Sequence, residues 1–379
     1  MAKVLYFTSA MNNDDYKGYL SLWNVPPNLS NQNFHNKFIR SLAITQQIEV
    51  ISVRPINSNF KAKTLQGAAK LENNITWNYI KVSSSKIDKL LNLNARIQKT
   101  VIGKVDKDSI IIVDVLNRTL LKSSLSVAKK YGCKVIGVCT DNPKNISFVD
   151  KNYANKILSL SKQLDGYVVL TNRLSDLFNP NNKPCLVIDG LTESVEFESN
   201  IRIDGDYLFF GGSLMRKYGV YNLIEAYKKL NNPNLKLVIC GHHEEEGFIS
   251  YIKQIPGVIY LGALPYQDVN YVQKHSVCAI NPRPIDPQID EYSIPSKTLE
   301  YLSNGVLTIC VNNLLLKEKY DSAIIWAQSG DVDDLYNALK EALTLSDKEK
   351  EKLVSNGVEL TKKYTSLETI NKQISKLFL

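Results

Sequence analysis

Short apolar runs alternate with helix-like segments along almost the whole chain, and this alternation limits the possible folds more than any other feature. Runs such as SIIIVDV (109–115) and DYLFFGG (206–212) leave no polar side for solvent. Strands that are buried on both faces belong to parallel sheets, whose successive strands are connected through helices. The sequence therefore predicts an α/β fold built from doubly wound, Rossmann-like sheets.

The alternation is interrupted once, by a polar and charged stretch without periodicity at 194–204. We interpret this stretch as a linker between two domains, at 1–194 and 205–360, because each then has the size of an ordinary domain. Two such domains are expected to face each other across a cleft. Within the first of them, the polar and aromatic stretch 10–30 is predicted to be a long loop.

Composition narrows the class of protein. Hydrophobic residues make up 44% and charged residues 22% of the chain, as in soluble globular proteins. No apolar run approaches the ~20 residues of a membrane-spanning helix, and the first residues lead into a strand rather than a signal peptide, so a cytoplasmic protein is expected. The six cysteines and four histidines show no metal-binding spacing, so the cysteines are expected to be reduced core residues.

The net charge of +8 suggests an anionic partner: nucleic acid, a membrane surface or a phosphorylated substrate. Basic residues are spread along the chain without a nucleic-acid-binding motif, so nucleic acid is not expected as a partner. A peripheral contact with anionic membrane is one expectation, and an ordinary solvated basic surface explains the charge equally well. Nothing in the sequence indicates an oligomeric state.

One segment, 281–305 (NPRPIDPQIDEYSIPSKTLEYLSNG), has the features of an anion-binding site. It follows a short apolar strand, and Pro295 is well suited to begin a helix because its missing N–H costs nothing there. The free amides of Ser296, Lys297 and Thr298, with the helix dipole, would attract an anion, and the Lys297 side chain and Arg283 would add full charges.

Glu300 lies one turn further along the same predicted helix. A carboxylate in this place is suited to accept hydrogen bonds from vicinal hydroxyls, so the segment would suit a nucleotide or nucleotide sugar. A solvated Lys–Glu pair on an ordinary capped helix would show the same spacing.

A second glycine-containing turn (FGGSLMRKYG, 210–219) opens the second domain, and it too would let backbone approach a ligand.

The motif IPSKTLEYLSNG, with NPR upstream, resembles the donor-binding segment of retaining GT-B glycosyltransferases, the family 4-like group that includes many bacterial polysaccharide and lipid-linked sugar transferases. The resemblance implies that Glu300 holds the ribose of the donor and that Ser296 and Lys297 meet its diphosphate. It also implies a UDP-sugar donor, retention at the anomeric carbon, and no metal or other cofactor. In this family the last helix, here 361–379, crosses back to the first domain.

Two departures from the family pattern concern charged residues. Ser213 and Tyr218 stand where the family has an arginine and a lysine that hold the diphosphate, and we expect the neighbouring Arg216 and Lys217 to replace them, next to Gly212. Tyr292 stands where many members have a glutamate facing the transferred sugar. Glu291, one residue away with Asp290 beside it, is therefore our candidate for that catalytic carboxylate.

Residues at predicted strand ends of the first domain are candidates for the acceptor side. Asp141 and Asn142 follow one strand and Arg118 follows another. We expect Arg118 and Asn142 to contact the acceptor and Asp141 to be catalytic, although turn chemistry explains an Asp-Asn-Pro sequence equally well.

The expected function is transfer of a sugar from a nucleotide-diphosphate sugar to a glycan or lipid-diphosphate acceptor in cell-surface polysaccharide synthesis, at the inner face of the membrane. Two alternatives remain open from the sequence. One is a non-catalytic GT-B subunit that supports an active transferase, because the usual cations are displaced. The other is a nucleotide-sugar epimerase of the same architecture.

Overall fold

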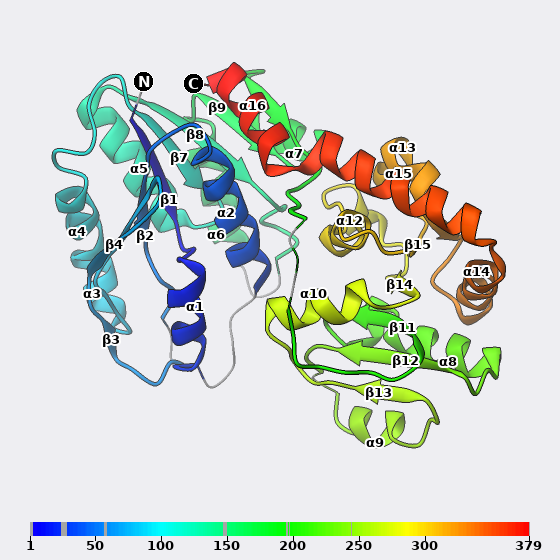
Figure 1. The fold of residues 1–379 in the computed structure, drawn as a ribbon. Helices are drawn as coiled ribbons and strands as arrows, with labels where there is room; N and C mark the ends of the chain where they lie inside the picture. The colour runs from blue at the N-terminus through cyan, green and yellow to red at the C-terminus, as the bar shows by residue number, and fades with distance from the viewer. Residues whose placement is uncertain are drawn as a thin grey trace. The chain divides into compact units, whose positions relative to one another are not determined.

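The computed structural model describes residues 3–23, 29–56, 59–146, 150–194, 196, 198–243 and 245–378 (Figure 1). The chain divides into two compact units. The first consists of Met1–Leu191 together with Leu367–Leu379, and the second of Thr192–Ser366. Each unit contains its own parallel or mostly parallel sheet, so the predicted α/β fold with Rossmann-like domains is confirmed.

The first unit contains an eight-stranded sheet with the order β10-β9-β8-β7-β1-β2-β5-β4. All neighbours pair in parallel except β4, which is antiparallel to β5 at one edge. The strands are β1 (Val4–Thr8), β2 (Ile48–Ser52), β4 (Ala68–Glu72), β5 (Ile75–Tyr79), β7 (Ile110–Asp114), β8 (Lys134–Cys139), β9 (Gly166–Val169) and β10 (Cys185–Val187). Two short strands, β3 (Thr64–Leu65) and β6 (Val82–Ser83), form a separate antiparallel pair.

The helices of the first unit are α1 (Asn13–Leu20), α2 (Leu29–Leu42), α3 (Lys86–Leu91), α4 (Leu93–Thr100), α5 (Arg118–Tyr131), α6 (Lys151–Ser161), α7 (Asn172–Phe178) and α16 (Leu367–Phe378). The prediction of one long loop over 10–30 was wrong, because α1 and the start of α2 lie inside it. The Asn12 side chain accepts hydrogen bonds from the amides of Asp14 and Asp15 and so caps α1. Residues 24–28 of this stretch lie outside the described part of the chain.

Helix α16 belongs to the first unit although it ends the chain, and it packs against α2 (Figure 1). Ile370 and Ile374 are fully buried there. The Ser41 hydroxyl donates to the carbonyl of Leu367 at 2.7 Å, and the Asn371 amide donates to the carbonyl of Ser41 at 2.6 Å. Apolar burial and paired polar groups thus both hold the last helix on α2.

The second unit contains six parallel strands in the order β13-β12-β11-β14-β15-β16. They are β11 (Asp206–Gly211), β12 (Leu235–Cys240), β13 (Val258–Tyr260), β14 (Cys278–Asn281), β15 (Thr308–Val311) and β16 (Ile325–Ala327). The chain builds the sheet outward from β11 in one direction and then continues from β14 in the other. The carboxyl ends of β11 and β14 therefore flank a topological switch point, where open α/β sheets bind ligands.

Side chains of β11 alternate between two apolar cores, one on each face of this sheet. Leu208 and Phe210 belong to a core with α8 (Val220–Leu230), α9 (Phe248–Ile252) and α14 (Val332–Thr344). Tyr207 and Phe209 belong to the other core, with α10 (Tyr266–Lys274) and α12 (Ser296–Ser303). The remaining helices are α11 (Pro287–Asp290), α13 (Leu314–Tyr320), α15 (Asp347–Thr365) and the 3-10 turns η1 (Arg216–Tyr218) and η2 (Asp321–Ala323).

All six cysteines are free thiols, and five of them are buried, as expected for core residues. None of the helices in the described part of the chain combines the length and apolar character that crossing a bilayer requires.

Candidate functional site

The switch point of the second unit brings together the two segments that the sequence singled out. Gly212 directly follows β11, and Asn281 ends β14. The Asn281 side-chain amide donates to the Thr298 hydroxyl at 2.9 Å, which ties the end of β14 to the first turn of α12. Two segments about 70 residues apart in the chain therefore meet at the predicted ligand-binding edge.

Lys297 lies directly over the end of β11. A Cβ atom built on Gly212 would overlap the Nζ atom of Lys297, and Gly212 has a φ of +154°, which other residues rarely adopt. The Nζ atom is also 5.4 Å from the ring centroid of Phe210. The lysine can take this position only because residue 212 has no side chain.

The surroundings of Lys297 make its positive charge costly. Burial lowers the pKa of Lys297 to about 8; Cys240 and Glu300 oppose this shift, and Arg283 adds to it. Arg283 and Glu300 thus lie within electrostatic range of the ammonium group. A bound anion would offset the loss of solvation and favour the charged form.

The loop after β14 packs tightly on the turn after β11. A Cβ on Gly219, whose φ is +79°, would overlap the carbonyl oxygen of Pro282. On the other side of the same loop, a Cβ on Gly330 would come within 2.9 Å of the Cα of Pro284. Two glycines therefore allow the NPRP sequence to lie against its neighbours, and this packing holds the two predicted phosphate-binding elements together.

Arg283 forms an ion pair with Asp290, and both side chains are largely buried. The second carboxylate oxygen of Asp290 accepts a hydrogen bond from the Asp286 amide at 2.8 Å. Asp290 therefore holds the Arg283 guanidinium in place and joins it to the turn that begins α11. Glu291 is exposed and forms the C-terminal cap of α11.

At the start of α12 the Thr298 amide is not free as predicted, because it donates to the carbonyl of Pro295 at 3.1 Å. Pro295 is its N-cap, and no side chain in the described part of the chain caps the helix. Ser296 is exposed, and Glu300 is partly buried one turn after Lys297. The amides of Ser296 and Lys297, the Lys297 ammonium group and the Glu300 carboxylate thus lie within two helical turns of each other.

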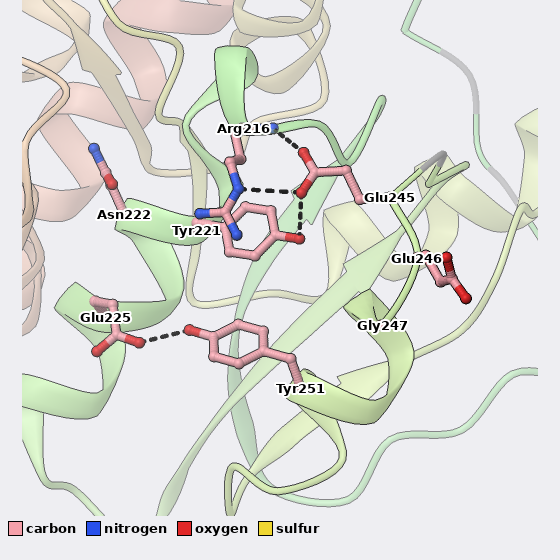
Figure 2. Close-up of a pocket in the computed structure, with 8 residues that line it drawn as sticks. All are labelled: Arg216, Tyr221, Asn222, Glu225, Glu245, Glu246, Gly247 and Tyr251. Carbon is pink, nitrogen blue, oxygen red and sulfur yellow. Dashed lines mark hydrogen bonds and ion pairs between the residues drawn. The ribbon is translucent and has the colours of Figure 1, made fainter.

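Arg216 and Lys217, the expected replacements for the family cations, lie on η1. The backbone amide and the Nε of Arg216 each donate to Glu245 at 3.1 Å, and its Cζ lies 3.8 Å from the Tyr221 ring centroid (Figure 2). Lys217 is exposed, with Nζ 5.1 Å from the Tyr218 ring centroid. The partly buried Ser213 lies between them and Gly212 in the chain.

The Arg216 side chain borders a pocket of about 420 Å³. Its lining residues are Arg216, Tyr221, Asn222, Glu225, Glu245, Glu246, Gly247 and Tyr251. Within it Tyr251 donates to Glu225 at 2.5 Å (Figure 2). Three carboxylates line this pocket, so it does not have the charge that an anion requires.

The acceptor-side candidates of the first unit follow neighbouring parallel strands, β7 and β8. The Arg118 amide donates to the Tyr153 hydroxyl at 3.1 Å, and the guanidinium lies 4.8 Å from the centroid of that ring. Asp141 accepts from the Asn142 amide at 2.8 Å, and Asn142 accepts from the Lys144 amide at 3.0 Å. These three residues therefore lie at the same edge of the sheet. Some of their polar groups already form hydrogen bonds with nearby residues in the turns.

A buried polar cluster that was not predicted from the sequence lies at the switch point of the first unit, between β1 and β7. His35 is fully buried; its Nδ1 is 2.6 Å from the Tyr6 hydroxyl, and its Nε2 is 3.5 Å from a carboxylate oxygen of Asp114. Burial alone would raise the pKa of Asp114, but His35 and hydrogen bonds from Asn31 and a backbone amide bring it below its ordinary value. The sequence contains one signal for this cluster, because Asp114 ends an otherwise wholly apolar strand.

Residues 192–359 match the family model described as "Glycosyl transferases group 1". No curated protein has a significantly matching sequence. Solved structures with the same fold include one described as "OtsA apo structure" (12% identity, TM-score 0.70, covering 100% of this chain and 99% of that chain). Sucrose-phosphate synthase from Thermosynechococcus elongatus has 11% identity and a TM-score of 0.70, with 99% and 98% covered.

A structure of HepE from Anabaena in complex with UDP and glucose is similar at 13% identity and a TM-score of 0.65, with 99% of both chains covered. These likenesses extend over both units, and the sequence match covers most of the second unit, including the switch point with Gly212 and Lys297. The whole chain therefore has the GT-B fold, and residues 192–359 form a group 1 glycosyl transferase domain.

Proposed function

We propose that this enzyme transfers a sugar from a UDP-sugar to a glycan or lipid-linked acceptor in cell-surface polysaccharide synthesis, with retention of anomeric configuration. Similar structures support the choice of donor: HepE is described with UDP and glucose, and an E. coli trehalose-6-phosphate protein with UDP-2-fluoro glucose. The latter covers 99% of this chain at 12% identity and a TM-score of 0.68.

The observation that carries the proposal is the position of Lys297 over Gly212 at the switch point, beside the open start of α12. The leaving group of the reaction is a nucleoside diphosphate, whose developing charge must be stabilised. A partly desolvated ammonium group and helix amides that are already oriented stabilise such a charge without reorganising during the reaction.

The neighbouring residues take complementary roles in this proposal. Arg283, held by Asp290, adds a second charge to the diphosphate, and Ser296 contributes its amide and hydroxyl. Gly212, Ser213, Arg216 and Lys217 form the other side of the donor site. Glu300 accepts hydrogen bonds from the ribose hydroxyls, since it lies one helical turn beyond the phosphate end.

Catalysis and acceptor binding are assigned to residues of both units. Glu291 and Asp141 are the proposed catalytic carboxylates, and Arg118 and Asn142 the proposed acceptor contacts. Transfer is proposed to need no metal or other cofactor, because cations of the chain take the charge of the diphosphate. Full activity in EDTA supports that part of the proposal, and loss that is restored by Mg²⁺ or Mn²⁺ contradicts it.

Calorimetric titration of UDP tests the donor site directly. Lys297→Met should bind UDP about tenfold to a hundredfold more weakly than wild type, because a charge-assisted hydrogen bond to phosphate is lost. Lys340→Met, a change at an exposed lysine of α14 in the same unit, is the matched control and should bind as wild type. Equal affinity of Lys297→Met and wild type for UDP would show that the donor diphosphate does not bind at Lys297.

A transfer assay then tests the reaction. Wild type should release UDP from one UDP-sugar of a labelled set when an acceptor is present, and chromatography of the product should show the retained anomer. If the protein binds UDP tightly but neither transfers nor hydrolyses any sugar, the proposed donor site is supported and the proposed transfer reaction is contradicted.

A further inference from the structure

Helix α3 presents an apolar face that nothing in the described structure covers. Ile87, Leu90 and Leu91 are 71%, 82% and 67% exposed. Their spacing of i, i+3 and i+4 places them on one side of the helix. Among the described residues no other helix or strand exposes three large hydrophobic side chains, whereas isolated ones occur on any protein surface.

This face is surrounded by positive charge. Residues 81–104 contain six basic side chains and a single acidic one, Asp88, although Lys104 forms an ion pair at 2.9 Å with Glu49, which lies outside this range. Asp88 is held by Arg96 through two hydrogen bonds of 2.7 and 2.8 Å, so its charge is neutralised by a residue of α4. Lys81 and Lys86 are exposed, and so is Lys63, whose carbonyl accepts from the Ser84 amide at 2.9 Å.

The helix is firmly attached to the unit despite its exposed face. Ser85 caps its start by accepting from the Asp88 amide, and the Lys89 ammonium donates to the carbonyl of Ile56 at 2.6 Å. The apolar side chains are therefore presented on a fixed element.

We propose that the α3 face, defined as Ile87, Leu90 and Leu91 with Lys63, Lys81 and Lys86 around it, docks on an anionic lipid bilayer. Apolar side chains enter the interfacial region of a bilayer while lysines contact the acidic headgroups. This inference deepens the proposed function, because an acceptor carried on lipid lies at that surface.

A second copy of this chain fits the face less well. Stable protein interfaces bury about 800 Å² on each partner, far more than three side chains on a six-residue helix provide. A symmetric contact through this face would also bring the lysines of both copies together, and like charges oppose such a contact. A bilayer offers the opposite charge and an apolar layer beneath it.

Co-sedimentation with vesicles tests the proposal, using the full chain without any nucleotide. Wild type should bind vesicles of phosphatidylcholine with about one third phosphatidylglycerol, and bind pure phosphatidylcholine vesicles at least tenfold more weakly. The bound fraction should also fall at high salt, because screening weakens attraction to the headgroups.

Two variants of the face and two matched controls locate the contact. Leu90→Ser should weaken binding at least about tenfold, and Lys86→Gln about fivefold. The controls are Leu71→Ser, at an exposed leucine of β4, and Lys129→Gln, at an exposed lysine of α5; both should bind as wild type. All four should keep the wild-type melting temperature within a few degrees, since the side chains are exposed.

Three outcomes would overturn the proposal: wild type that stays in the supernatant with anionic vesicles, Leu90→Ser that binds them as wild type does, or controls that lose as much binding as the variants of the face. A wild type that dimerises through this face in analytical ultracentrifugation, while leaving vesicles unbound, would assign the face to a second copy. Because UDP titration uses no lipid and sedimentation uses no UDP, failure of the donor site and failure of the docking face are seen separately.

Discussion

Lys297 and Gly212 occupy adjoining space, so that a side chain on residue 212 would overlap the lysine ammonium group. Gly212→Ala should therefore displace Lys297 and weaken UDP binding about tenfold or more, with loss of ~1–3 kcal/mol of stability from the backbone conformation. Calorimetry gives the affinity, and denaturant unfolding gives the stability.

Gly205→Ala separates these two effects. Gly205 also has a positive φ, of +74°, but a Cβ there would meet no atom within 4 Å. This variant should lose stability by a similar amount and bind UDP as wild type. Equal losses of affinity in the two variants would show that backbone strain, not the position of Lys297, governs binding.

Nucleotide affinity should fall as the pH rises through about 8. The pKa of Lys297 is lowered to about 8 by burial, so the free enzyme loses the charge above that pH, whereas the anion binds the charged form. Between pH 7.5 and 9 the Kd for UDP should rise about fivefold to tenfold. Lys297→Met should bind weakly with a flat profile, and a flat wild-type profile would contradict the assignment.

The same lowered pKa predicts an effect on stability. An unfolded lysine has a pKa of 10.5, so between pH 8 and 10.5 the unfolded chain binds more protons than the folded one. Stability without nucleotide should therefore increase with pH through this window, and the cost is fully present below pH 8. Lys297→Met should melt above wild type at pH 7, while binding UDP less well. A variant that melts lower would show that the ammonium group stabilises the unliganded fold.

Elements with a strong hydrophobic periodicity were predicted well from the sequence. Elements and contacts that depend on capping or on packing between distant residues were predicted less well. Strand β11 (Asp206–Gly211) lies within the apolar run predicted at 206–212, because a buried strand has a distinct pattern. Helix α1 was missed because its polar sequence depends on the Asn12 cap. The contacts of Lys297 with Gly212 and of Gly219 with Pro282 join residues far apart in the chain, and no local pattern encodes such pairs.

The proposed role of Glu300 can be tested on the ligand as well as on the protein. Glu300→Ala should bind UDP about a hundredfold more weakly, because hydrogen bonds between a carboxylate and two hydroxyls are lost. Wild type should bind 2′,3′-dideoxy-UDP with a similarly reduced affinity, and the variant should not distinguish the two nucleotides. If Glu300→Ala still prefers UDP over the dideoxy analogue as strongly as wild type, another residue holds the ribose.

Arg216 is engaged by Glu245 and stacked on Tyr221, so it can reach a diphosphate only by leaving that carboxylate. Glu245→Gln removes the competing charge and keeps a hydrogen-bond acceptor, so UDP should bind about twofold to fivefold more tightly, the range expected for an exposed ion pair. Arg216→Ala should bind about tenfold more weakly, and the double variant should match Arg216→Ala, because the effect of Glu245 acts through the arginine. Calorimetric titration of UDP into the three variants measures these differences. Wild-type affinity in Arg216→Ala would exclude Arg216 from the donor site and leave Lys297 and Arg283 as the cations of the diphosphate.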